Sequence, residues 1–88
     1  MLLGVPRKKE SQLGLAWAIK KTRVEAEVSQ GTLAERVEVD PSQISRLEKG
    51  GNPSWGMVRR VAYGLDVDLD QLCDLAEDFE RRRRDRAD

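Results

Sequence analysis

The segment from Ser29 to Gly50 constrains the fold more than any other, because it contains two short helical patterns joined by only about three residues. Ser29 is a good N-cap for the first helix, which is expected to end near Val37. Asp40 caps the second helix, and proline follows it at the first helical position, where a missing N–H costs nothing. The second helix is expected to end near Lys49, with Gly50 available as a left-handed C-cap. Two short helices joined by so tight a turn must cross steeply.

The second of these helices carries very little apolar surface. Within "DPSQISRLEKG" only Ile44 and Leu47 are strongly apolar, whereas a surface helix normally hides a stripe at least about 100° wide. These two residues, spaced i, i+3, can anchor the helix and leave its other side free. Ala34 is small enough for a close crossing, and Val39 can fill the turn. The segment therefore has the pattern of a helix-turn-helix whose second helix lies in a DNA groove.

The spacing of apolar residues predicts three more helices, and strand signals are nearly absent. One helix runs from Ser11 or Gln12 to Ala26, one follows Ser54 as its N-cap, and one follows Asp68. The expected inner positions of the five helices are Leu15, Ala16, Ile19, Thr22 and Ala26; Leu33, Ala34 and Val37; Ile44 and Leu47; Trp55, Val58, Val61, Ala62 and Leu65; and Leu69, Leu72, Ala76 and Phe79. The sequence predicts an all-α, five-helix domain over residues 11–80.

Both ends of the chain carry basic runs. We expect residues 1–10 to form a flexible N-terminal arm, whose "RKK" at 7–9 can reach a DNA backbone or minor groove. The "RRRR" at 81–84 belongs to an arginine-rich continuation of the fifth helix over residues 81–88. Acidic residues precede these arginines at i, i+4, which favours a solvated, salt-bridged face over a DNA-binding tail. The expected pairs are Glu77–Arg81, Asp78–Arg82 and Glu80–Arg84.

Composition argues against several other functions. Histidine is absent and Cys73 is the only cysteine, so a Ser-His or Cys-His dyad, an internal disulfide and a cysteine-rich zinc site are excluded. No tight group of Asp and Glu residues suggests a metal site. We therefore expect no enzyme activity, no cofactor and no metal. No apolar run is long enough to span a membrane, and we expect a cytoplasmic protein of a bacterium or phage, associated with the nucleoid.

Charge is balanced overall but unevenly distributed. The chain has 16 Lys and Arg against 16 Asp and Glu, although a nucleic-acid-binding domain is usually basic. Residues 1–23 carry six basic side chains and one acidic, whereas residues 61–80 carry seven acidic and no basic ones. One face can therefore still attract phosphate.

The stretch "SQGTLAERVEVDPSQISRLEKGGNPS" resembles the Cro/lambda-repressor type of helix-turn-helix protein, also called the XRE family. The resemblance extends in one register from about Leu15 to Leu72. It implies a five-helix domain whose third helix enters the major groove of DNA. It also implies that Gln30 contacts a phosphate at the start of the second helix, and that Arg23 and Glu48 form a structural ion pair.

The chain departs from the family at three helix ends. Glu27, Glu38 and Asp66 stand where the family usually has glycine. A left-handed residue that carries a side chain costs roughly 1 kcal/mol or more. Either these turns differ from those of the family, or the domain tolerates some strain.

The exposed side of the third helix supplies the candidate DNA contacts. Arg46 can form a bidentate contact to guanine, although a phosphate contact or a solvated arginine stays open. The expected base contacts come from Pro41, Ser42, Gln43, Ser45 and Arg46. The expected phosphate contacts come from Ser29, Gln30, Lys49, Gly51 and Asn52. For several of these residues the alternative is simply helix-start or loop chemistry.

The first helix has a second apolar stripe, nearly opposite its core face, that contains Leu13, Trp17 and Val24. One small core cannot bury both sides of this helix. The "MLLGVP" segment, the far end of the fifth helix, or a second subunit must cover Trp17. We expect a two-fold interface formed by Leu13, Trp17, Leu75 and Phe79.

The resemblance implies a sequence-specific transcriptional regulator of the repressor type, which binds a palindromic operator in double-stranded DNA as a homodimer. The alternative is a protein–protein interaction module, such as an anti-repressor or an antitoxin-like protein, that kept the fold with weak or no DNA binding. Nothing in the sequence points to a small-molecule ligand or a membrane partner.

Overall fold

The computed structural model describes residues 12–87, which form five helices and no strand. The helices are α1 (Gln12–Glu25), α2 (Gln30–Val37), α3 (Pro41–Glu48), α4 (Trp55–Gly64) and α5 (Leu69–Ala87). The predicted all-α fold is thus confirmed, and the helix bounds agree with the prediction to within about a residue. The expected N-terminal arm over residues 1–10 lies outside the described residues.

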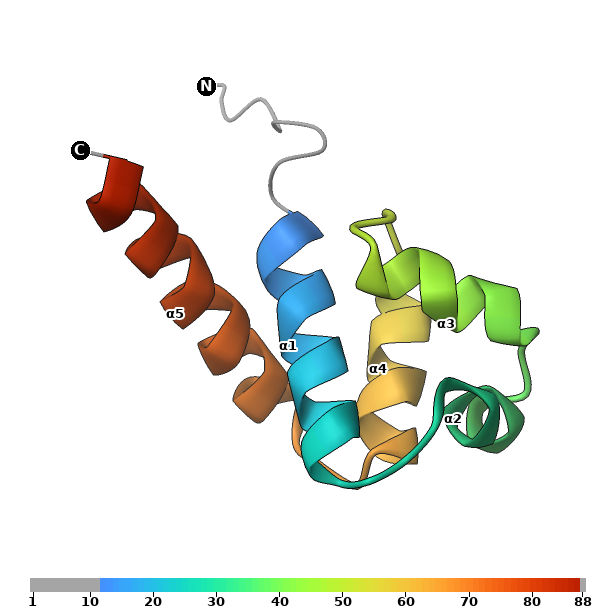
Figure 1. Ribbon diagram of the computed structural model, residues 1–88. Helices are drawn as coiled ribbons and strands as arrows, with labels where there is room; N and C mark the ends of the chain where they lie inside the picture. The colour runs from blue at the N-terminus through green and yellow to red at the C-terminus, as the bar shows by residue number, and fades with distance from the viewer. Residues whose placement is uncertain (1–11, 88) are drawn as a thin grey trace.

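Each helix contributes one large, fully buried side chain to a single core. These side chains are Ile19, Leu33, Ile44, Val61 and Leu72, all of them at predicted inner positions. α1 packs against α5 along one side and against α3 on the other (Figure 1). α2 contacts both α3 and α4, so the core holds the α2–α3 pair against the rest of the domain. Burial of this apolar surface is the main stabilising contribution to the fold.

Two predicted inner positions are wrong. Trp55 is 64% exposed, because it is the first residue of α4 and lies beyond the edge of the core, which starts one turn later at Val58. Ala26 is exposed because it lies past Glu25, the last residue of α1. The error at Trp55 leaves a large aromatic side chain on the surface.

The three helix ends without glycine keep the left-handed geometry. The residues with φ near 60° are Glu27, Glu38 and Asp66. Each of them is followed by a valine that packs against the core: Val28, Val39 and Val67. The domain therefore tolerates the strain, and the alternative of different turns is wrong.

The same pair of hydrogen bonds closes each of these ends. After α2, the Glu38 N–H donates to the Glu35 carbonyl at 3.2 Å, and the Val39 N–H donates to the Ala34 carbonyl at 3.0 Å. This pattern is the Schellman motif, in which an apolar residue just after the left-handed one packs back on its helix. The half-buried valine and the two hydrogen bonds offset the cost of a left-handed glutamate.

α5 continues through the arginine run to Ala87, as the sequence predicts. Of the three predicted ion pairs only Asp78–Arg82 forms, at 3.0 Å. Arg81 instead reaches Asp78 at 3.3 Å. Glu80 pairs with Arg83, three residues on, at 3.5 Å. The predicted Glu77–Arg81 pair is wrong, because Arg81 pairs with Asp78 instead. The predicted Glu80–Arg84 pair is also wrong, because Glu80 pairs with Arg83 and accepts a hydrogen bond from the Gly14 N–H at 2.7 Å.

Candidate nucleic-acid interface

A capping box fixes the start of α3. The Asp40 carboxylate accepts a hydrogen bond from the Ser42 N–H at 3.0 Å, and the Gln43 side-chain oxygen accepts one from the Asp40 N–H at 3.3 Å. The hydrogen bond from Ser42 lowers the pKa of Asp40 below its ordinary value. Pro41 occupies the first helical position. The amide oxygen of Gln43 is therefore engaged in the cap, while its amide nitrogen is directed elsewhere.

The outer side of α3 is exposed, as the sequence predicts. Ile44 and Leu47 are buried and anchor the helix. The five residues expected to contact bases lie on the same helix: Pro41, Ser42 and Arg46 are exposed, and Gln43 and Ser45 are half-buried. Two anchors thus hold a helix whose remaining surface faces away from the core.

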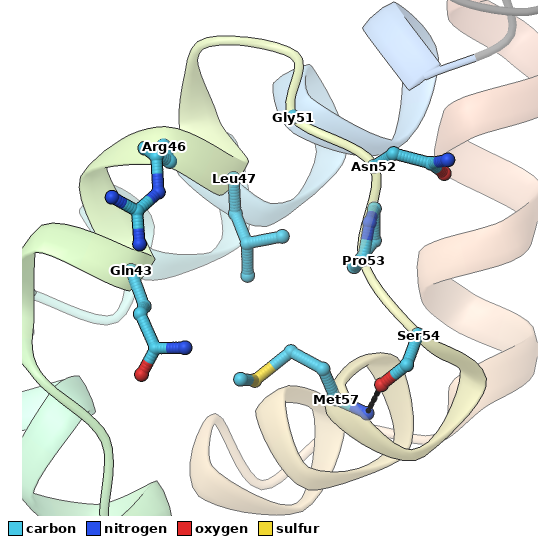
Figure 2. A pocket seen from close by; sticks show the side chains of 8 residues that line it. All are labelled: Gln43, Arg46, Leu47, Gly51, Asn52, Pro53, Ser54 and Met57. Carbon is cyan, nitrogen blue, oxygen red and sulfur yellow. Dashed lines mark hydrogen bonds between the residues drawn. The ribbon is translucent and has the colours of Figure 1, made fainter.

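A hollow of about 280 Å³ lies between α3, the segment 51–54 and the start of α4. Its lining residues are Gln43, Arg46, Leu47, Gly51, Asn52, Pro53, Ser54 and Met57. Figure 2 shows Gln43 and Arg46 together on the α3 side of the hollow, with Met57 facing them from α4. The Ser54 hydroxyl caps α4 by accepting a hydrogen bond from the Met57 N–H at 3.1 Å. The hollow brings two expected base contacts together with two expected phosphate contacts, Gly51 and Asn52.

Met57 and Pro53 line this surface although sequence reasoning did not select them. The sequence did contain a signal for them: only a few residues separate the end of α3 from Ser54, the N-cap of α4. So short a connection forces the first turn of α4 to lie beside α3. Asn52 is exposed and its side chain points away from Arg46 (Figure 2). Asn52 and Arg46 thus do not share one side of the hollow, and the expected phosphate contact of Asn52 stays a prediction.

After α3, glycine occupies both positions at which α1, α2 and α4 are followed by an acidic residue and a valine. The Gly50 N–H donates to the Leu47 carbonyl at 3.1 Å, and the Gly51 N–H donates to the Arg46 carbonyl at 2.9 Å. Gly50 has φ near 100°. A Cβ on Gly51 would lie 2.9 Å from the Arg46 carbonyl oxygen. Glycine at position 51 is therefore required by the close packing of this turn on the Arg46 carbonyl, and the N–H groups of both glycines are already engaged within the turn.

The start of α2 flanks α3 on the other side of the interface. The Ser29 hydroxyl accepts a hydrogen bond from the Thr32 N–H at 3.0 Å and so caps the helix. The Gln30 amide donates to a Glu48 carboxylate oxygen at 2.9 Å. The sequence did not reveal that Gln30 is tied to the last residue of α3. This bond fixes the N-terminus of α2 relative to the end of α3. Free N–H groups at a helix N-terminus attract anions.

Arg23 and Glu48 form a nearly buried ion pair between α1 and the end of α3. Their side chains are 12% and 4% exposed, and the Arg23 Nε lies 2.6 Å from Glu48 Oε2. Arg23 Nη2 donates to the other carboxylate oxygen at 3.0 Å, and Nη1 donates to the Val28 carbonyl at 2.9 Å. The hydrogen bond with Glu48 raises the pKa of Arg23. With Gln30 also donating to Glu48, three elements meet at one carboxylate and set the orientation of α3.

In the second stripe of α1, Trp17 is partly covered by another part of the same chain, whereas Leu13 and Val24 stay exposed. The rings of Trp17 and Phe79 stack with centroids 5.2 Å apart, and the Lys21 ammonium lies 5.5 Å above the Trp17 ring. The far end of α5, one of the three expected covers, therefore contacts Trp17, and the "MLLGVP" segment lies outside the described residues. Leu13 is 39% exposed and Leu75 is half-buried. A contact of this surface with a second copy stays a prediction.

Other kinds of site find little support in residues 12–87. No group of three or more Cys, Asp or Glu side chains in this part of the chain is arranged to hold a metal ion. None of the described helices is long and apolar enough to cross a membrane.

Comparisons with known proteins agree with this geometry. The model of a family described as "Helix-turn-helix domain" matches residues 15–75, which is more than half of the chain. No curated protein matches the chain. The matched range starts within α1 and ends within α5, so it contains all of α2, α3 and α4.

Solved structures of transcriptional controllers share the fold. The restriction-modification controller protein C.AhdI from Aeromonas hydrophila is 26% identical, with a TM-score of 0.67 over 69% of this chain and 94% of that chain. The clp gene regulator ClgR from Corynebacterium glutamicum is 22% identical, with a TM-score of 0.79 over 92% and 90%. The controller C.Esp1396I, solved as a tetramer in complex with its natural 35 base-pair operator, is 23% identical, with a TM-score of 0.69 over 78% and 97%. The chain has the fold of DNA-binding regulators.

Proposed function

The chain belongs to the helix-turn-helix domain family, and on that premise we propose that it is a transcriptional repressor that binds a palindromic operator as a homodimer. α3 lies in the major groove and reads bases with Arg46 and the first helical turn. The ends of α2 and α3 contact the flanking phosphates. The proposed regulator works in the cytoplasm, in contact with the DNA of a bacterium or phage.

The observation that carries this proposal is the contrast between the two sides of α3. Ile44 and Leu47 are buried, whereas Arg46 is exposed at the hollow that α3 shares with α4. A guanidinium can donate two parallel hydrogen bonds to guanine O6 and N7, the commonest specific contact in the major groove. The Arg23–Glu48–Gln30 network holds the end of α3 in place. A fixed helix with a free polar side is suited to insertion into a groove.

The surroundings of α3 suit phosphates. Ser29 and Gln30 stand at the N-terminus of α2, where the helix dipole favours an anion. Lys49, Gly51 and Asn52 follow α3, and the exposed side chains of Lys49 and Asn52 can donate hydrogen bonds to a phosphate. Such contacts position a protein on the duplex without reading its sequence.

We infer a homodimer because the surface of α3 that can contact bases is small. α3 has eight residues, and one such helix contacts only a few base pairs. Specific sites are usually bound at least about 10³-fold more tightly than non-specific DNA, which two half-sites achieve more readily than one. The structurally similar controller C.Esp1396I assembles as a tetramer on its operator, which supports an oligomer here.

Selection of bound sequences from a pool of random duplexes, using the purified wild-type protein, tests the proposal. We expect an enriched motif with two inverted half-sites about one helical turn, roughly 34 Å, apart. An enriched single half-site would contradict the dimer but not the reading by α3. Absence of any enriched motif, together with absence of salt-dependent binding to random DNA, would contradict DNA binding and favour the protein-interaction module.

A further inference from the structure

The outer face of α4 carries the two most exposed aromatic side chains among residues 12–87. Trp55 is 64% exposed and Tyr63 is 86% exposed. With Arg59 between them they are spaced i, i+4, i+8, so at about 100° per residue the three fall within about 80° of one another. Unlike Trp17, which stacks on Phe79, Tyr63 has most of its surface uncovered. Exposed aromatic residues of this kind are enriched at protein interfaces.

A hollow of about 530 Å³ lies beside this stripe, between α4 and the start of α5. Arg59 and Tyr63 line it from α4, and Asp68 and Leu69 line it from the start of α5. Gly56 also lines it, and a Cβ on Gly56 would meet only the Ser54 hydroxyl, at 3.9 Å. The hollow is therefore open at Gly56 and large enough to receive an aromatic ring from another molecule.

The charges at this hollow are divided between its two sides. Arg59 is exposed on the α4 side. The exposed carboxylates of Asp66, Asp68 and Asp70 follow one another at the turn into α5. In a two-fold dimer both molecules contribute the same surface to the contact. One side of that surface on the first molecule therefore faces the other side of it on the second. A face that is basic on one side and acidic on the other is therefore complementary to a second copy of itself.

We propose that two copies of this chain meet through this α4 face about a two-fold axis. Tyr63 of each copy enters the hollow of the other, and Arg59 of each copy faces Asp68 of the other. This contact gives the homodimer of the proposed function its interface, and it rests on that part of the proposed function. The contact leaves the recognition surface open, because Met57, which faces α3, lies about 120° around α4 from Tyr63.

Sedimentation of the full chain without DNA tests this interface. Tyr63→Glu and Arg59→Asp should each raise the dimer dissociation constant by about 30-fold or more, as expected for anchor residues of an interface. Val24→Glu is the matched control, because Val24 is also an exposed apolar residue, 54% exposed, but lies on α1. It should leave the dissociation constant unchanged. Thermal unfolding of each variant checks that the fold is retained.

A charge exchange makes the test specific for the proposed pairing. Asp68→Arg alone should also weaken the dimer, whereas Arg59→Asp together with Asp68→Arg should restore most of the affinity, because the two charges are then exchanged across the axis. A double variant that is weaker than both single variants would overturn the pairing.

The outcomes separate this inference from the proposed function. A wild-type dimer that persists in the Tyr63 and Arg59 variants overturns the α4 interface and leaves the homodimer intact. The surface formed by Leu13, Trp17, Leu75 and Phe79 is then the next candidate. A wild-type protein that is monomeric both free and on its selected DNA overturns the interface and the homodimer together. Variants that are monomeric yet still bind the selected half-site support the interface and keep DNA reading by α3.

Discussion

Arg36 and Arg60 each close the end of the other's helix. The Arg36 guanidinium, from α2, donates to the carbonyl of Gly64 at the end of α4 at 2.9 Å. The Arg60 guanidinium, from α4, donates to the carbonyl of Val37 at the end of α2 at 2.5 Å. The last carbonyls of a helix lack partners within the helix, and a cation there also interacts favourably with the helix dipole. The two arginines thereby join α2 to α4.

Gly64 permits this close approach, which leads to a first prediction. A Cβ on Gly64 would lie 2.8 Å from Val37 Cγ1 and 3.0 Å from Leu33 Cδ1. Gly64→Ala should therefore lower the free energy of unfolding by about 1 kcal/mol or more, since overpacking typically costs about 1–3 kcal/mol. Gly31→Ala is the control, because a Cβ there would meet only the Ser29 hydroxyl at 3.8 Å. It should raise stability by up to about 1 kcal/mol. Denaturant unfolding measures both, and equal effects would contradict the packing argument.

The left-handed glutamate after α2 gives a second prediction. Glu38 has φ near 60°, which costs an L-residue roughly 1–2 kcal/mol and costs glycine much less. Glu38→Gly should therefore raise the free energy of unfolding by about 0.5–1 kcal/mol, after the larger entropy loss of glycine is subtracted. Glu35→Gly, three residues earlier inside α2, should lower it by about 1 kcal/mol. If Glu38→Gly is instead less stable than wild type, the Glu38 side chain stabilises the fold by more than its left-handed backbone destabilises it.

Local patterns predicted most of this fold but not how its parts are tied together. At Ser29, Asp40 and Ser54 the capping side chain bonds an N–H only two or three residues further along the chain. These caps can therefore be predicted from a few neighbouring residues. The Arg36 and Arg60 bonds join residues 28 and 23 positions apart. These bonds depend on how α2 crosses α4, and the crossing cannot be predicted from a local sequence pattern.

The candidate interface shows the same division. The two apolar anchors of α3 predicted which side is exposed, and the family resemblance supplied the Arg23–Glu48 pair. The bond from Gln30 to Glu48 was missed, because it requires knowing that the start of α2 meets the end of α3. Trp55 was misplaced because periodicity gives the direction of a side chain but not where the core ends along the helix axis.

The Glu48 carboxylate is expected to be a large contributor to stability. Glu48→Ala leaves the Arg23 guanidinium without its partner at a nearly buried position, and breaking such a pair from one side costs about 3–5 kcal/mol. Glu25→Ala is the control, since the Lys21–Glu25 pair is 2.7 Å long but its side chains are 37% and 63% exposed. Exposed pairs contribute about 0–1 kcal/mol. Chemical denaturation of the two variants should separate them clearly, and equal midpoints would mean that Glu48 does not stabilise the fold.

Acid should weaken the start of α3 through Asp40. The hydrogen bond from Ser42 lowers the pKa of Asp40 in the folded protein. The stabilisation by its carboxylate is therefore complete above the pKa of the unfolded chain and is lost as the pH falls through the lowered folded pKa. Asp40→Asn keeps a capping oxygen but does not titrate. The stability difference between wild type and Asp40→Asn should shrink between about pH 6 and about pH 2. A difference that stays constant over this range would contradict the role of the ionised cap.

Arg46 and Lys49 should differ in what they contribute to DNA binding, although they are only one turn apart. Arg46→Ala should cost about 1–3 kcal/mol on the selected site and relax the preference at one base pair in each half-site, because a bidentate base contact is lost. Lys49→Ala should weaken binding to all duplexes about equally and reduce the salt slope by about 1 per monomer, because a phosphate contact is lost. Binding isotherms at several salt concentrations, on selected and random duplexes, measure both effects. If Arg46→Ala kept the selected motif, or if Lys49→Ala changed the motif without changing the slope, the two roles would be assigned wrongly.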